Sequence, residues 1–152
     1  MSFEDPKTTI LNLLKKNFGA FKDDDTAATV NVCFEFPQEE LPKRFESSDV
    51  ILTVGRESEI GLRLGLSSKF QYKGNYRIGV WAKEKQNING ERICTRSIQK
   101  LKGIIKEFER TPGGNLSFIR EVNVKDDDRV GNPTIFHRIV MCETWHFGQE
   151  ET

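Results

Sequence analysis

The spacing of apolar residues predicts two amphipathic helices, one near the start of the chain and one in its second half. The first is expected over residues 6–18, where Asp5 provides an N-cap and Gly19 ends the helix. The second is expected over residues 90–110, between the N-cap Asn89 and a Pro-Gly-Gly stop. In both segments apolar residues recur every three or four positions, so each helix presents one apolar stripe to a sheet.

Alternation of apolar and polar residues predicts strands in the rest of the chain. The charged stretch 38–49 is expected to form a loop, and Lys73-Gly74-Asn75 a turn. The resulting order, α-β-β-β-β-α-β-β, indicates an α+β fold with one mainly antiparallel sheet and two helices packed on one of its faces. The expected strands cover residues 29–36, 50–54, 59–66, 76–83, 116–124 and 134–147.

Length and composition favour a single domain over residues 1–152, with a frayed tail at about 149–152. A chain of 152 residues can bury a core without disulfide or metal staples, and no linker or internal repeat divides it. No apolar run approaches the roughly 18 residues that span a bilayer, and acidic residues interrupt the first positions of the chain. We therefore expect a soluble protein that is neither exported by a secretory signal peptide nor embedded in a membrane.

Charge and cysteine content narrow the function classes further. The 23 Lys and Arg residues are balanced by 23 Asp and Glu residues, so no global field attracts the chain to phosphate backbones or anionic membranes. Three cysteines, an odd number without a C-x-x-C pair, argue against a disulfide framework or a zinc finger. We interpret Cys33, Cys94 and Cys142 as buried thiols in a reducing compartment.

Catalytic and metal-binding groups are sparse in the sequence. The two histidines, His137 and His146, are expected on opposite faces of one strand, roughly 30 Å apart. Cys142 shares a face with His146, but about 13 Å of strand separates them, too far for one metal ion. The acidic runs 23–25 and 126–128 are typical of solvated loops. We therefore predict no catalytic residue, cofactor or metal site, and no enzyme activity.

A binding module for RNA or a protein partner inside the cell is the alternative function. Basic residues cluster on the second helix, and Tyr72, Tyr76 and Trp81 could stack on bases. The zero net charge and the acidic neighbours on that helix argue against nucleic-acid recognition. An enzyme without a known motif is a third interpretation, for which the sequence offers no reaction class. The basic residues are Lys100, Lys102, Lys106 and Arg110.

The middle of the chain resembles a known family. Residues 76–83 (YRIGVWAK), the connection with Ile88-Asn89-Gly90, and the helix through Phe108 are similar to tail-completion or tail-terminator proteins of long-tailed phages and archaeal tailed viruses. The resemblance implies a ring, often a hexamer, at the head-proximal end of the tail tube, which ends tube growth and joins the neck. The chain departs from the family in its longer polar stretch 38–49 and its acidic tail.

That resemblance also implies partners and a location. The partners are further copies of the chain, the tail tube protein and the neck or connector proteins, with no cofactor and no membrane. The location is the virion tail or neck, assembled in the host cytoplasm. Glycines let another backbone approach a strand and aromatic residues anchor interfaces, so contacts are expected at Gly61, Gly65, Trp81, Phe136 and Trp145. For each of these, ordinary core packing is the alternative.

Overall fold

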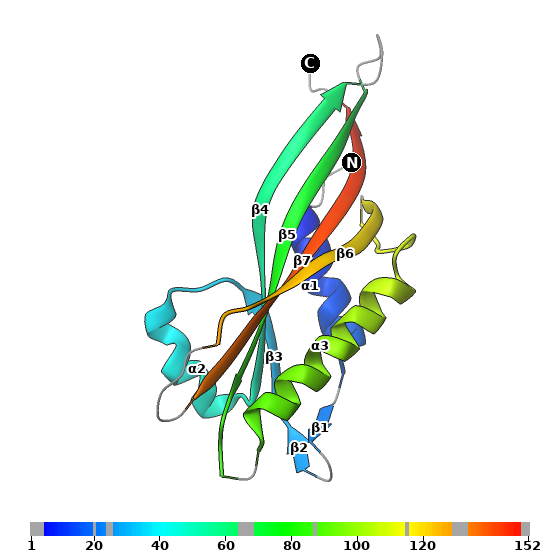
Figure 1. Cartoon of the computed structure of the whole chain (residues 1–152). Coiled ribbons are helices and arrows are strands. Elements are labelled where there is room, and N and C mark those ends of the chain that lie inside the picture. The colour runs from blue at the N-terminus through cyan, green and yellow to red at the C-terminus, as the bar shows by residue number, and fades with distance from the viewer. Residues whose placement is uncertain are drawn as a thin grey trace.

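A five-stranded sheet with helices on both faces forms the centre of the protein (Figure 1). The computed structural model describes residues 5–19, 21–23, 26–63, 69–86, 88–114, 116–128 and 134–149. The strand order is β3-β4-β5-β7-β6; β3 runs parallel to β4, and each other neighbouring pair is antiparallel. The strands are β3 (Val30–Phe34), β4 (Val50–Arg63), β5 (Lys69–Lys83), β6 (Leu116–Asp126) and β7 (Ile135–Gln149).

The two predicted helices are confirmed, and both lie on the same face of the sheet. Helix α1 (Pro6–Asn17) begins where the Asp5 carboxylate accepts a hydrogen bond from the Lys7 amide, and it is followed by Gly19 at a positive φ of 66°. Helix α3 (Gly90–Glu107) begins where the Asn89 side chain accepts from the Arg92 amide. Helix α1 packs on β3 and β4, and α3 packs on β5, β7 and β6.

The main hydrophobic core lies between these two helices and the sheet. Alternate residues of the central strands point into it, and the helices add their apolar stripes. A mainly antiparallel sheet with two helices on one face, as predicted, is therefore present. Its fully buried side chains include Leu14 of α1, Leu101 of α3, Val54 of β4, and Tyr76 and Ile78 of β5.

The expectation of a loop over residues 38–49 was wrong, because a third helix lies there. A 3-10 turn, η1 (Gln38–Glu40), leads into α2 (Leu41–Ser47), which covers part of the opposite face of the sheet. Pro42 is tolerated because it occupies the first helical turn, where its missing N–H has no partner to lose. Leu41 and Phe45, four residues apart, supply the buried stripe.

Two predicted interruptions of the sheet were also wrong. Residues 50–54 and 59–66 were expected as separate strands, but β4 runs from Val50 to Arg63 with a register shift between Arg56 and Ser58. The expected turn at residues 73–75 is continuous strand, paired with β4 on one side and β7 on the other. Two-sided pairing holds Gly74 extended, and the Tyr76 ring occupies the space beside its Cα.

The sheet reaches beyond the helices at one end. Strands β4, β5 and β7 continue there as a long, twisted arm at the top of Figure 1. A short hairpin of β1 (Phe21–Asp23) and β2 (Thr26–Ala28) lies at the other end. Strand β7 comes last in the sequence yet lies between β5 and β6. The predicted frayed tail, about 149–152, was wrong at Gln149, which ends β7 and pairs with Lys69; residues 150–152 lie outside the described residues.

Candidate functional site

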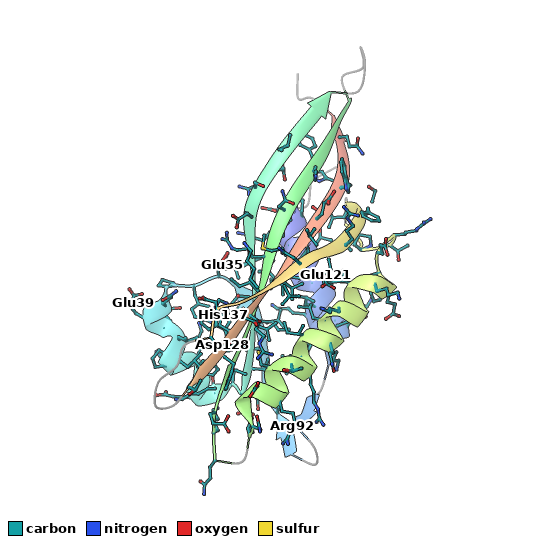
Figure 2. All side chains as sticks on the ribbon, viewed as in Figure 1. Glu35, Glu39, Arg92, Glu121, Asp128 and His137 are labelled. Atoms are coloured by element: carbon teal, nitrogen blue, oxygen red, sulfur yellow. The ribbon has the colours of Figure 1, made fainter. Side chains whose placement is uncertain are left out.

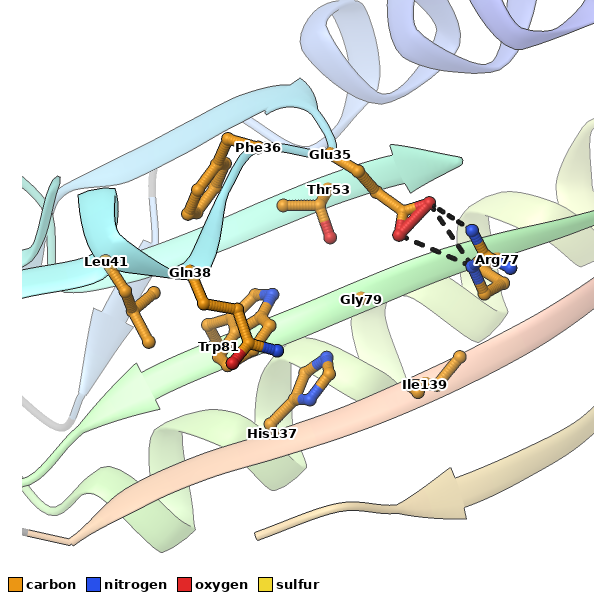
Figure 3. A pocket seen from close by; sticks show the side chains of 10 residues that line it. All are labelled: Glu35, Phe36, Gln38, Leu41, Thr53, Arg77, Gly79, Trp81, His137 and Ile139. Atoms are coloured by element: carbon orange, nitrogen blue, oxygen red, sulfur yellow. Dashed lines mark hydrogen bonds and ion pairs between the residues drawn. The ribbon is translucent and has the colours of Figure 1, made fainter. Parts of the chain in front are cut away.

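A hollow of about 140 Å³ opens on the α2 side of the sheet. Strands β4, β5 and β7 form its floor, and the segment from the end of β3 into α2 forms one wall (Figure 3). Leu41 and Phe36 give that wall an apolar surface, while an ion pair between Glu35 and Arg77 stands at the rim. Aromatic, charged and hydroxyl groups from four chain segments converge on it.

Two glycines make this arrangement possible. Gly79 lies in the floor, where an added Cβ would collide with the Thr53 hydroxyl and come within 3.1 Å of His137 Nε2. Gly55 of β4 pairs with Arg77 at the rim, and the Glu35 side chain occupies the space that a Cβ would take. Larger residues at either position would displace the polar groups that define the site.

An aromatic pair forms the deepest wall. The rings of Trp81 and His137 come from neighbouring strands in register and stack with centroids 3.4 Å apart and an interplanar angle of 10°. The Asp127 carboxylate lies 3.0 Å from His137 Nδ1. Because a carboxylate only accepts hydrogen bonds, it holds a ring proton on Nδ1. The imidazole is therefore fixed in orientation, with Nε2 toward the hollow.

The rim is charged. Arg77 donates to Glu35 at 2.6 Å and to Glu57 at 2.5 Å, so one guanidinium bridges two carboxylates. These hydrogen bonds raise the pKa of Arg77, which keeps it charged under all ordinary conditions. Glu57 sits at the β4 register shift, which turns its side chain toward β5.

A second polar cluster lies on the same face, out on the arm. The Glu143 carboxylate accepts hydrogen bonds from Arg120 at 2.9 Å and from the Trp145 indole at 2.8 Å, with Lys73 at 3.7 Å. Burial alone raises the pKa of Glu143, but these donors outweigh it and hold the pKa below its ordinary range. The cluster is fully paired and stabilises the strands that it connects.

The five residues predicted for subunit contacts do not form one patch. Trp81 is buried in the hollow, and Phe136 is half-buried against the main core on the opposite face. Trp145 belongs to the Glu143 cluster on the arm. Gly61 is exposed on the arm, where an added Cβ would press on the Tyr72 ring at 2.9 Å. Gly65 lies outside the described residues, and the contacts themselves stay predictions.

The thiols, histidines and acidic runs form no metal site among the described residues: no group of three or more His, Cys, Asp or Glu side chains there could hold an ion. His137 and His146 lie on opposite faces of β7, as expected. Burial raises the pKa of Cys94 and Cys142 to about 12, so both thiols stay protonated and unreactive. No helix in the described ranges is long and apolar enough to cross a membrane.

Sequence reasoning missed the hollow for an identifiable reason. The alternation in residues 76–83 placed Arg77, Gly79 and Trp81 on one face, which the structure confirms. The opposing wall depends on α2, which was expected to be a loop. The apolar pair Leu41 and Phe45, four residues apart after a proline, was the available signal.

No protein-family model matches the chain, and no curated protein matches it either. Its fold is similar to that of a solved chain described as the sheath/tube terminator, in the extended state, of PVC, an extracellular contractile injection system. The TM-score is 0.55 at 10% sequence identity. The likeness covers all of this chain, which spans 59% of the length of that one. A terminator-like fold is therefore shown.

Proposed function

We propose that this protein is a terminator subunit that forms a ring at the end of a tail-like tube and stops the tube from growing. The supporting observation is the likeness of its whole fold to a chain described as a sheath/tube terminator. That description names a structural part and not an enzyme. The tail-terminator resemblance in residues 76–108 supports the same role from the sequence.

We infer that the ring is a hexamer of this chain, that it sits on the last ring of tube subunits, and that its other side joins neck or connector proteins. The natural setting that we propose is the tail or neck of a virion, assembled in the host cytoplasm. An extracellular contractile injection system is the setting of the similar solved chain.

Electron microscopy of the purified protein, alone and mixed with the tube protein, tests this role. Rings of uniform diameter, and tubes capped at one end and limited in length, are the expected result. A persistent monomer that leaves tube length unchanged would contradict it. Immunogold labelling of particles from the source would then separate the two settings, because only virions carry a head beside the labelled tail end.

RNA binding is the alternative function to be tested. Tyr76 is fully buried in the main core and Trp81 is buried in the hollow, so neither offers an open ring face to a base. Salt-dependent retention on single-stranded RNA at low ionic strength would revive this alternative. We expect no retention above that of a neutral control protein.

A further inference from the structure

The two edge strands of the sheet are protected to different degrees. Figure 2 shows Glu121 of β6 on the α3 side of the molecule and Glu35, directly after β3, on the α2 side. The Ile119 amide of β6 donates to the Glu109 carbonyl at 2.9 Å, so the segment after α3 covers part of that edge. Two register shifts and four charged residues lie along the same strand. Such bulges and charges hinder pairing with another chain.

Every second residue of β3 turns its backbone groups away from the sheet. The Thr29 carbonyl accepts a hydrogen bond from β4, and the Glu35 amide donates one to β4. In a parallel pair, residues that bond to the neighbour alternate with residues that face the other way, so the odd-numbered positions face β4. The amide and carbonyl groups of Val30, Val32 and Phe34 therefore point to the outer edge, and no described strand pairs with them there.

The sequence of β3 contains none of the usual protections of an edge. It reads VNVCF, without a charged residue or a proline, and its register with β4 has no shift over the whole strand. Its side chains are half-buried, except that Phe34 is 37% exposed. An uncharged, regular edge with unpaired amide and carbonyl groups is a template on which another extended chain can pair.

A groove of about 690 Å³ lies beside this edge. Its lining comes from α1, from residues 29–32 and from the end of α2, so the edge runs between two helices. Val30 and Val32, which are half-buried against the main core, give it apolar surface. Lys15 of α1 is exposed and is the only charged residue among the described residues that line it. The groove therefore suits an extended segment with apolar residues at alternate positions and a carboxylate near Lys15.

The described strands of a second copy do not suit this edge. Strand β5 and nearly all of β7 are paired on both sides. The edges of β6 and of the arm half of β4, residues 56–63, carry register shifts and four charged residues each. Two β3 strands would pair about a twofold axis, whereas a ring closes through head-to-tail contacts. A segment that pairs with β3 is therefore expected from a different protein.

We propose that β3 accepts an extended segment of the tube protein, which adds a sixth strand to the sheet. The inference rests on the proposed function, which gives the tube protein as a partner. The segment exchanges hydrogen bonds with Val30, Val32 and Phe34, places alternate apolar side chains over the groove, and brings a carboxylate to Lys15. Main-chain hydrogen bonds supply affinity, and the alternate side chains supply specificity. The added strand attaches the terminator to the end of the tube.

Hydrogen exchange of the β3 amides tests the added strand in the full-length protein bound to assembled tubes. Exchange is stopped at a series of times, and the nitrogen-15 labelled chain is dissolved in dimethyl sulfoxide for NMR. In the free chain the amides of Asn31 and Cys33, which face β4, should exchange more slowly than those of Val30, Val32 and Phe34. On tubes, the three outward amides should slow at least about tenfold, since they gain hydrogen bonds to the new strand.

A proline on the outer edge removes a single donor of the proposed pairing. The Val32 amide faces away from β4, so Val32→Pro keeps the sheet's own hydrogen bonds. It should lower the affinity for tube ends at least about tenfold, measured as the fraction of capped tubes against concentration. Val32→Ala is the matched control, because it also changes the side chain but keeps the amide; it should bind nearly as well as wild type.

Charge reversal beside the groove is a milder test that leaves the backbone intact. Lys15→Glu should raise the concentration for half-capping about three- to tenfold, because it repels the carboxylate of the segment. Lys16→Glu makes the same change on the next residue of α1, which does not line the groove, and should have no such effect. Thermal unfolding checks that each variant is folded, and if Val32→Pro fails to fold, the two lysine variants decide.

The outcomes separate the two proposals. A chain that leaves tubes uncapped overturns the terminator role and the added strand together. Capped tubes on which the amides of Val30, Val32 and Phe34 still exchange fast overturn the added strand alone. Slow exchange of these amides in the free chain that depends on its concentration also overturns it, because a second copy would then occupy the edge.

Discussion

The two faces of the sheet are built differently. The face under α1 and α3 is an apolar core whose strand residues, such as Leu52 and Ile78, are fully buried. Among the described residues, the face under α2 has a cluster of four buried hydrophobic residues, and beside them lie a stacked histidine, ion pairs and a hollow. The first face holds the fold together, and the second keeps polar groups in fixed positions at the cost of a small core.

Replacing one buried leucine on each face with alanine should give the largest difference in the free energy of unfolding. Leu101→Ala, in the centre of α3, should lower the free energy of unfolding by about 3–4 kcal/mol, because the large core cannot collapse around the cavity. Leu41→Ala should cost about 2 kcal/mol, because the short α2 can move to fill the gap. Urea unfolding of both variants measures this, and an equal loss would contradict the distinction.

Replacing one glycine on each face with alanine should change the stability of the protein in opposite directions. Gly79→Ala should destabilise by about 1–3 kcal/mol, because the new methyl collides with Thr53 and crowds the His137 and Trp81 rings. Gly103→Ala, on α3, meets no atom within 4 Å and should stabilise by about 0.5–1 kcal/mol through helix propensity. Thermal unfolding distinguishes them; a neutral Gly79→Ala would show that the hollow is loosely built.

The Glu143 cluster on the polar face predicts a pH dependence. Glu143→Gln should cost about 1–2 kcal/mol at neutral pH, because Arg120 and Trp145 lose a charged acceptor. The folded-state pKa of Glu143 is lowered, so its stabilisation is present above the unfolded pKa of about 4.3 and is lost as pH falls through the folded pKa.

Chemical unfolding of wild type and Glu143→Gln across acid pH checks this sign. The gap between the two stability curves should shrink as pH falls through the lowered folded-state pKa of Glu143 and close below it, since both side chains are then neutral. Arg120→Gln provides the control. It removes a donor to Glu143, so the pH at which stability is lost should be higher in this variant than in the wild type. A gap between wild type and Glu143→Gln that stays constant throughout the acid range would contradict the assignment.

The smallest effect is expected at the exposed end of the arm. Ile60 is 55% exposed on β4, so Ile60→Ser should change the free energy of unfolding by less than about 0.5 kcal/mol. Denaturant midpoints of Ile60→Ser and Leu101→Ala, measured under the same conditions, compare this small effect with the large one. A loss above about 1 kcal/mol would mean that the side chain packs against something in solution.

The sequence predicted those elements whose signals are local. Helices α1 and α3 have caps, stripes and stops within their own residues, so Asp5, Gly19 and Asn89 placed their ends closely. The prediction of where strands are interrupted failed, because continuity depends on the neighbouring strands. Gly74 resembles a turn residue in the sequence, but it pairs with both β4 and β7.

The same limit applies to the candidate site. Arg77, Gly79 and Trp81 were placed together on one face of a strand, because alternation is a property of the strand itself. Their meeting with His137, 56 positions after Trp81 in the sequence, depends on the register of β5 and β7, which no local pattern fixes.

The central place of the last strand has a consequence for synthesis. Lys83 pairs with Ile135 and Lys69 with Gln149. Both α3 and β6 are therefore synthesised before β7, the second neighbour of β5 in the sheet. Strand β6 pairs with β7 alone, so it has no partner in the sheet until residues 135–149 leave the ribosome. A nascent chain therefore cannot complete the hollow until β7 has been made, because His137 comes with that strand.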